Sequence, residues 1–345
     1  MNYEKLQAVG WQRFFDAQLS AAERECRVAR VCAHHGGHLM LRDDEEFAIP
    51  IQLAGDGHDV AVGDWMVLDP TSHRVHRTLE RSSLILRVAA GLTVRTQPIA
   101  ANIDTILIVM SCNEDFNLSR AERYLALVLQ SGATPVVVLT KADLAGDRWT
   151  LIRQVQELHD GLVVEALDTR DAEQTAVLAD WCGPGQTVAL VGSSGVGKST
   201  IANSLGTSHQ QVGGIREADG KGRHTTTSRS LHLLNSGGVL IDNPGMRELK
   251  LPGCEQGVAE VFVDVVEISH RCRFHDCRHQ GDAGCAFPDA LAAGEIDERR
   301  FHSFLKLDAE QQHYDRTLQE RRERDRHFGR LYKATIADKQ RRRGR

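Results

Sequence analysis

The sequence predicts a multidomain α/β protein in which a small β-barrel and a helical domain flank a domain built on a parallel sheet. Residues 26–90 contain short apolar runs separated by glycine-rich turns, as in small barrels. From Ala101 onward, apolar runs alternate with amphipathic stretches, which is typical of strands and helices in a parallel sheet. After Gly253 the chain becomes charged and helix-like.

Length and composition are consistent with this architecture. At one domain for about 100–200 residues, 345 residues allow two or three domains. An apolar share of 41% is enough for real cores and excludes disorder as the main state. The sequence has no apolar run of about 18 residues, which excludes a membrane-spanning helix. Residues 1–25 lack the basic-then-apolar plan of a signal peptide, so we expect a cytoplasmic protein.

The first two expected units are an N-terminal extension, residues 1–25, and an OB-like β-barrel, residues 26–95. The extension contains one amphipathic stretch, Leu6–Leu19, and is expected to be an appendage. Barrel strands are expected at Arg27–Cys32, His38–Leu41, Phe47–Ile51 and Asp64–Leu68. Their number suits an oligonucleotide-binding (OB) barrel but does not distinguish it from other small barrels.

Residues 96–252 are expected to form the parallel-sheet domain. Its strands are predicted at Ile103–Met110, Pro135–Leu139, Leu162–Leu167, Thr187–Val191 and Gly238–Ile241. Its helices are predicted at Asn117–Gln130, Thr150–Leu158, Ala172–Trp181 and Ser199–Leu205. The continuous apolar run Ile103–Met110 is typical of a parallel strand that is covered on both faces.

The C-terminal part divides into a helical domain, residues 253–310, and a basic helical tail, residues 311–345. Arg316–Arg345 contains 12 basic and 4 acidic residues, whereas the rest of the chain contains 30 basic and 43 acidic residues. A basic tail on an acidic body indicates a polyanionic partner that binds at one end. A solvated helix without such a partner would show the same charges.

A phosphate-binding loop follows the strand Thr187–Val191. Gly192-Ser-Ser-Gly-Val-Gly-Lys-Ser199 matches G-x-x-x-x-G-K-[ST] in the strand-to-helix context that the motif requires. Its glycines let successive N–H groups face one anion, and the following helix points its positive end at the same anion. Lys198 can reach the β- and γ-phosphates, and Ser199 can bind Mg²⁺. The alternative is a Gly-Ser turn without function.

Two further motifs stand at the ends of predicted strands. Asp242-Asn-Pro-Gly245 follows Gly238–Ile241, where a carboxylate can face Mg²⁺ and a glycine can approach a γ-phosphate. Thr140-Lys-Ala-Asp143 follows Pro135–Leu139. There a carboxylate can accept both the N1–H and the 2-amino group of guanine, which adenine does not offer. Thr140 and Asp143 would equally suit a helix N-cap.

Four residues in the C-terminal part have the spacing of a metal site, Cys272-x4-Cys277-x-His279-x5-Cys285. Three thiolates and one imidazole make a closed tetrahedral set, which suits structural zinc. His275 lies between the first two cysteines and is an alternative ligand. The other cysteines are scattered, and we expect them to be reduced and mostly buried; they are Cys26, Cys32, Cys112, Cys182 and Cys254.

The order of the motifs is unusual, because a guanine-reading motif ordinarily follows the phosphate loop and here precedes it. A circular permutation would keep the same sheet and the same site. Together with these motifs, further segments resemble the RsgA (YjeQ/YloQ) family of small-subunit-dependent GTPases. These segments are Val62–Trp65, Gln97–Asp104, Phe116-Asn117, Glu122–Leu125 and Gly222–Thr227.

The resemblance implies a circularly permuted P-loop GTPase that hydrolyses GTP during late maturation of the 30S ribosomal subunit. The subunit would stimulate hydrolysis, and hydrolysis would promote release of the protein. Expected partners are GTP or GDP and the 30S subunit with its 16S rRNA, and a monomer is favoured. The implied cofactors are Mg²⁺ with GTP and one structural Zn²⁺, for which the family pattern selects His279 rather than His275.

The implied site residues fall into three sets. Nucleotide binding is expected from Thr140, Lys141, Ala142, Asp143, Ala166, Gly192, Ser193, Ser194, Gly195, Val196, Gly197, Lys198, Ser199, Thr200, Asp242 and Gly245. Zinc is expected on Cys272, Cys277, His279 and Cys285, and magnesium on Ser199, Thr226 and Asp242. The expected catalytic residues are His224, Lys198 and Thr226.

Some positions depart from the family pattern. Thr140 replaces an asparagine, which predicts a weaker bond to the phosphate loop. Glu165 replaces a serine, although the Ala166 N–H can still meet the guanine O6 atom. Met246 takes the place of the glutamine that orients the attacking water in many GTPases. We therefore expect His224 to hold that water.

Three other expectations follow from the same segments. Alignment with other GTPases favours Thr226 among Thr225–Thr227 as the Mg²⁺ ligand that senses the γ-phosphate. The loop at residues 213–227 is rich in glycine and charge, which predicts slow turnover until the ribosome orders it. Asp282-Ala283 replaces a frequent Glu-Pro in the zinc loop, and we expect little consequence.

Two other functions remain open from the sequence. An rRNA-binding assembly chaperone would use GTP only as a ligand, with hydrolysis not essential. A P-loop kinase or ATPase would share the phosphate loop, but Asp143 argues against it and no pocket for a second substrate is evident.

Overall fold

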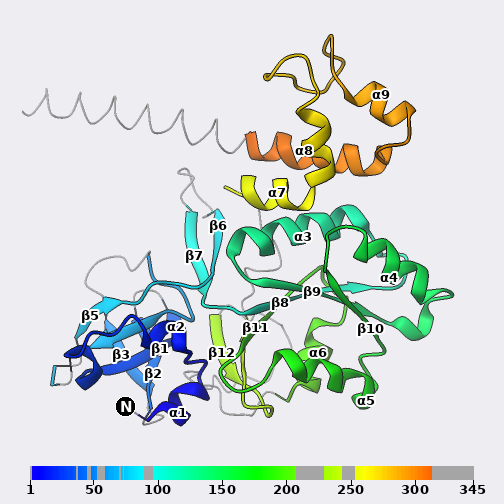
Figure 1. Cartoon of the computed structure of the whole chain (residues 1–345). Helices are drawn as coiled ribbons and strands as arrows, with labels where there is room; N and C mark the ends of the chain where they lie inside the picture. Colours follow the sequence, from blue (N-terminus) through cyan, green and yellow to red (C-terminus); the bar gives the residue numbers. More distant parts are fainter. Residues whose placement is uncertain are drawn as a thin grey trace, which may run out of the picture.

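The structure is a computed structural model. It describes residues 2–35, 38–44, 48–52, 59–69, 71–72, 74–88, 96–206, 229–242 and 253–312. Three parts follow one another in Figure 1: an N-terminal β-rich part, a central sheet covered by helices, and a C-terminal helical part above helix α3. Within these described ranges, none of the helices is long and apolar enough to cross a membrane.

Among its described residues, the N-terminal part contains five antiparallel strands. They are β1 (Arg27–His35), β2 (His38–Arg42), β3 (Ala48–Gln52), β4 (Trp65–Leu68) and β5 (Val75–Thr78). Strand β1 pairs with β4 through its first half and with β2 through its second half, with a register shift between Val31 and Ala33. One strand shared in this way bends the sheet towards a barrel. The pairings of the described residues do not join β3 to β5, so the OB-like barrel remains a prediction.

Residues 2–25 are not an appendage, contrary to our expectation. They form helices α1 (Tyr3–Gln7) and α2 (Arg13–Asp16) and a 3-10 turn at Glu23–Glu25. Most of the large apolar side chains of the Leu6–Leu19 stretch are buried against β1 and β4, with Trp11 edge-on to Trp65 at 4.7 Å between ring centroids, whereas Phe14 is exposed. The amphipathic stretch was predicted correctly, but its apolar side packs into a core with strands β1 and β4.

The central sheet has the strand order β10-β9-β8-β11-β13-β12. All neighbours are parallel except the β13–β12 pair. The strands are β8 (Thr105–Ser111), β9 (Thr134–Thr140), β10 (Val163–Leu167), β11 (Thr187–Val191), β12 (Arg229–Leu233) and β13 (Val239–Asp242). Every residue of β8 is buried, as its continuous apolar run predicted. Each strand predicted for this domain is present with its ends within two residues of those expected.

Helices cover both faces of this sheet (Figure 1). Helices α3 (Leu118–Ser131) and α4 (Arg148–Gln156) share one core with Ile106 and Ile108. Helix α6 (Lys198–Ser204) packs in the other core with Leu107 and Val109. Successive residues of β8 thus point to opposite faces. The helix expected at Ala172–Trp181 is divided into α5 (Ala172–Thr175) and a 3-10 helix, Ala176–Trp181.

A hairpin that we did not predict connects the two parts. Strand β6 (Leu84–Val88) pairs antiparallel with β7 (Thr96–Ala101), and together they form a separate two-stranded sheet. The domain boundary that we expected between residues 95 and 96 therefore falls inside this hairpin.

The N-terminal part and the central sheet are joined by hydrogen bonds as well as by the chain. Strand β12 pairs with β1, Ala33 opposite Ser230, so the two sheets are continuous. Arg30 is fully buried at this junction and donates to the Val9, Gly63 and Asn102 carbonyls and to the Thr187 hydroxyl. Burial lowers the pKa of Arg30 to about 10, so its side chain stays charged at neutral pH.

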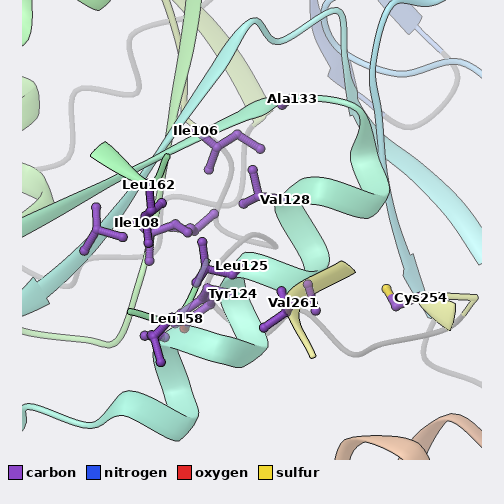
Figure 2. Close-up of a cluster of buried hydrophobic side chains, with 14 of the residues drawn as sticks. Ile106, Ile108, Tyr124, Leu125, Val128, Ala133, Leu158, Leu162, Cys254 and Val261 are labelled. Atoms are coloured by element: carbon purple, nitrogen blue, oxygen red, sulfur yellow. The ribbon is translucent and has the colours of Figure 1, made fainter. Parts of the chain in front are cut away.

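The C-terminal part packs directly on α3. It contains α7 (Glu255–Val261), α8 (Val263–Ser269) and α9 (Phe287–Ala292), and residues 298–312 are also helical. A Cβ atom at Gly257 would lie 2.0 Å from the Ala126 carbonyl oxygen, so only glycine lets α7 approach α3 this closely. Figure 2 shows Val261 beside Tyr124 and Leu125 of α3, in the core shared by the two parts.

Candidate functional site

The phosphate loop lies between β11 and α6 at the carboxyl edge of the parallel sheet. Gly192, Gly195 and Gly197 all have positive φ angles, of 140°, 79° and 103°, which L-residues rarely adopt. A Cβ atom at Gly192 would lie 2.2 Å from the Val109 carbonyl oxygen. The loop must therefore contain glycine there to curl beside β8. The Lys198 ammonium group donates to the Gly192 carbonyl at 2.7 Å and also to the Ser193 carbonyl.

Thr140 braces the phosphate loop from β9. Its buried hydroxyl lies 2.6 Å from the Val196 carbonyl oxygen and 3.1 Å from that of Met110. The next residue, Lys141, has a left-handed backbone and donates its ammonium group to the Gly195 carbonyl at 3.3 Å. The bond that we expected the threonine to weaken is thus present and short. It joins the Thr140–Asp143 motif to the phosphate loop.

The predicted base-reading residues stand at the ends of two neighbouring strands. Leu139 of β9 pairs with Ala166 of β10, so the loops after these strands lie next to each other. Asp143 lies in the 3-10 turn Ala142–Leu144, and its side chain is 31% exposed. It does not cap a helix, because the N-cap of α4 is Asp147. The Asp143 carboxylate instead accepts a bond from Arg170 at 2.8 Å.

Asp242 ends β13, next to β11 in the sheet, and is exposed at the same carboxyl edge. Ser199 and Thr200 lie in the first turn of α6 and are also exposed. The sheet therefore brings Thr140–Asp143, Ala166, Gly192–Thr200 and Asp242 to one edge, as parallel strands do.

Several predicted residues lie outside the described part of the chain. They are His224, Thr225–Thr227 with the rest of the loop at residues 213–227, and Gly245 with Met246. Residues 313–345, which include most of the basic tail, lie outside it as well.

The four predicted zinc ligands meet between α8 and α9. The ligand atoms of Cys272, Cys277, His279 and Cys285 all lie within 4.8 Å of one another. His279 Nδ1 lies 3.6 Å from the Cys272 sulfur and 3.8 Å from the Cys285 sulfur. His275 is exposed and does not belong to the group. Three thiols and one imidazole gathered this closely fit a tetrahedral zinc ion.

Two features of this loop were not foreseen. His279 adopts φ of 59°, and its ring packs edge-on to Phe287 at 4.7 Å between centroids. The Asp282 carboxylate accepts the backbone N–H groups of Arg278 and Gln280, at 3.0 and 3.3 Å. Asp282 therefore holds the loop around the ligands. Of the scattered cysteines, four are buried as expected, and Cys26 is half-buried.

The segment Glu122–Leu125 connects the phosphate loop with the C-terminal part. Glu122 is completely buried and accepts bonds from both Arg299 and Arg300. Burial raises the pKa of Tyr124, and the Ser193 side chain of the phosphate loop, which lies near its hydroxyl, opposes this shift. We had noted this segment only as a resemblance, because its partners are distant in the sequence.

Comparison with known proteins agrees with this geometry. A sequence model described as "RsgA GTPase" matches residues 78–252, which include the phosphate loop and both strand-end motifs. The chain belongs to the RsgA GTPase family. It is therefore an enzyme of the GTPase class.

Relatives extend the RsgA match over most of the chain. A "Small ribosomal subunit biogenesis GTPase RsgA 2" of Vibrio parahaemolyticus is 48% identical over 340 residues, which cover 98% of this chain and 94% of that protein. A "Small ribosomal subunit biogenesis GTPase RsgA" of Mesorhizobium japonicum is 44% identical over 310 residues, 88% of this chain and 89% of that one.

Two solved RsgA-type structures share the fold. YjeQ from Thermotoga maritima superposes with a TM-score of 0.59 at 22% identity, over 81% of this chain and 96% of that one. YloQ, described as a circularly permuted GTPase, superposes with a TM-score of 0.56 at 22% identity, over 88% of this chain and 98% of that one. They confirm the permuted GTPase fold that the order of the motifs predicted.

Proposed function

We propose that this chain hydrolyses GTP on the small ribosomal subunit, assists late maturation of the subunit, and leaves it when GTP is hydrolysed. The relatives that match over most of the chain are named for biogenesis of that subunit. The observation that carries the proposal is the carboxyl edge of the sheet, where a phosphate loop, a base-reading motif and a strand-end carboxylate converge. The protein acts as a monomer in the cytoplasm, where the subunits mature.

Guanine is read at the ends of β9 and β10. The Asp143 carboxylate accepts the N1–H and 2-amino groups, and the Ala166 N–H donates to the O6 atom. Thr140, Lys141 and Ala142 hold this motif against the phosphate loop, for which the short Thr140 bond gives support. Adenine lacks the donors that Asp143 would accept, so ATP binds more weakly.

The triphosphate lies on the backbone N–H groups of residues 192–200, at the positive end of α6. On binding, the Lys198 ammonium group exchanges the Gly192 and Ser193 carbonyls for phosphate oxygens, which carry full charges. Ser199, Thr226 and Asp242 would hold Mg²⁺, and the ion would neutralise charge on the β- and γ-phosphate oxygens. Gly245 gives the backbone room beside the γ-phosphate.

Hydrolysis requires a group that orients the attacking water. Met246 has no hydrogen-bonding group for this role, and His224 takes it. Contact with the ribosomal subunit brings His224 and Thr226 to the nucleotide, so turnover is slow without the subunit.

The outer parts recognise the subunit. A zinc ion held by Cys272, Cys277, His279 and Cys285 would cross-link the loop between α8 and α9. Arg273 and Arg278 of this loop are exposed, which suits contact with 16S rRNA phosphates. The basic residues of the C-terminal tail and the N-terminal strands add further rRNA contacts.

The His224→Ala variant tests whether hydrolysis matters. The variant should bind GTP and the subunit like the wild type but should neither hydrolyse GTP rapidly nor leave the subunit. Release at the wild-type rate with GTP would show that hydrolysis is not required. The protein would then act as a GTP-regulated assembly chaperone.

A further inference from the structure

Arg170 is the residue that contacts Asp143, and its guanidinium group is held by its own loop. It lies after β10, two residues beyond Asp168, whose carboxylate it grips with Nε and Nη2, each at 2.9 Å. The Asp168 carboxylate also accepts the Arg170 backbone N–H at 3.0 Å. The Asp168 N–H donates to the Gln174 side chain at 3.0 Å, which fixes the start of the loop.

The same guanidinium group reaches across to the neighbouring loop. Arg170 Nη2 donates to Asp143 Oδ2 at 2.8 Å. Among the described residues, no other side chain bonds to the Asp143 carboxylate. One arginine thus joins the loop after β9, which bears Asp143, to the loop that follows β10, the strand that bears Ala166.

Guanine recognition suggests a role for the hydrogen bond between Arg170 and Asp143. The base presents two donors side by side, so a carboxylate must present both oxygens in one plane. A free aspartate rotates about its Cβ–Cγ bond and meets the base in that plane only part of the time. Arg170 bonds to Oδ2 alone, and each carboxylate oxygen accepts two bonds. Oδ2 can therefore keep Arg170 while it accepts the 2-amino group, and Oδ1 can accept N1–H.

Exposure argues that this bridge does not serve stability. The Arg170 side chain is 72% exposed, and ion pairs at such positions add little to the free energy of folding. We expect Arg170 to contribute instead to the orientation of the Asp143 carboxylate.

We infer that Arg170 is a positioning residue that orients Asp143 towards the guanine 2-amino group and so raises the preference for guanine nucleotides. This inference rests on the proposed role of Asp143. It adds a residue in the loop after β10, outside the motifs that the sequence revealed.

The test compares dissociation constants for GDP and IDP, because hypoxanthine lacks the 2-amino group. Arg170→Ala should weaken the binding of GDP about three- to fivefold, the value of one exposed charged pair, and should weaken the binding of IDP by a smaller factor, because IDP keeps only the N1–H bond. Arg170→Lys should resemble Arg170→Ala, because lysine has no fork to grip Asp168 and Asp143 together. Arg153→Ala is the control and should change neither constant, because Arg153 is exposed on α4 and its side chain bonds only to Thr150 among the described residues.

Three results would overturn the inference. An equal loss for GDP and IDP would mean that Arg170 only supports the loop. Tighter binding of both would mean that it blocks the base site. Unchanged binding of GDP and IDP would mean that the Arg170–Asp143 contact has no effect on nucleotide binding.

Two reference measurements separate this inference from the proposed function. The wild type should prefer GDP to ADP. Asp143→Asn should bind GDP more weakly and XDP more tightly than the wild type does, because xanthine presents a carbonyl group to which the new amide can donate. If either fails, base reading by Asp143 is wrong and the role of Arg170 is wrong with it. If both hold while Arg170→Ala leaves the GDP-to-IDP ratio unchanged, only the role of Arg170 is wrong.

Discussion

Truncation of Glu122 should release the C-terminal part from the GTPase core. The Glu122 carboxylate is 0% exposed in α3 and is contacted by Arg299 and Arg300 from the last described helix. The Arg123 side chain, one residue on, pairs with Glu310 of that same helix, but these partners are 26% and 24% exposed. The two pairs offer a matched comparison, since they join the same two helices and differ in burial.

The structure sets the size of the expected effects. Removal of one partner from a buried ion pair costs about 3–5 kcal/mol. Arg299 is 38% exposed and Arg300 also pairs with Asp264, so both retain other interactions after Glu122→Ala. We therefore expect a loss of about 2–3 kcal/mol for Glu122→Ala. For Glu310→Ala, the partly exposed pair predicts about 1 kcal/mol or less.

Hydrogen exchange measures this loss locally, which matters because a multidomain chain need not unfold in one step. Amides of α7, α8 and residues 298–312 should open about 30- to 150-fold more often in Glu122→Ala and about fivefold or less in Glu310→Ala. Amides of β8 and β11 should stay unchanged in both variants. Equal effects of the two substitutions, or loss of protection in β8 as well, would refute the view that buried Glu122 fastens the C-terminal part.

Three other predictions concern the phosphate loop, the metal and pH. Thr140→Val keeps the side-chain volume but leaves a buried carbonyl without its donor, so GDP should bind about 5- to 50-fold more weakly in equilibrium titration; unchanged affinity would exclude the brace. Cys285→Ser should lower the zinc measured by elemental analysis from one ion per chain to a small fraction, whereas Cys26→Ser, outside the cluster, should keep it. Arg77 lowers the pKa of the Glu23 carboxyl to about 2 from an ordinary 4.5. Because the folded value is the lower one, this pair stabilises the packing of residues 2–25 above pH 4.5 and loses that effect as pH falls from 4.5 to about 2. Exchange of α1 and α2 amides should rise over that window, and Glu23→Gln should reduce this rise.

Local sequence patterns predicted much of the fold and of the candidate site. The phosphate loop and the zinc set depend on residues close in the chain, so spacing indicated both sites, although the choice of His279 over His275 came from the family pattern. The run Thr187–Val191 was predicted to the residue because a buried strand bounded by turns has a simple signal. The Asp242 position followed from the rule that parallel strands end at one edge.

What the sequence did not reveal depends on contacts between distant segments. The buried apolar side chains of Leu6–Leu19 pack against Trp65. The buried Glu122 carboxylate is paired with Arg299 and Arg300, far along the chain. Arg170 resembles any exposed arginine until the register of β9 and β10 sets it against Asp143. The β6–β7 hairpin was missed because its two strands pair across the domain boundary that we expected.

Phosphate release from GTP and from ATP, with and without purified 30S subunits at one stated salt concentration, tests the central claim most directly. We predict slow release with the protein alone, release from GTP stimulated many-fold by the subunits, and little release from ATP under either condition. Equal use of ATP, or GTP turnover that the subunits leave unchanged, would contradict the claim that this site couples guanine recognition to the small ribosomal subunit.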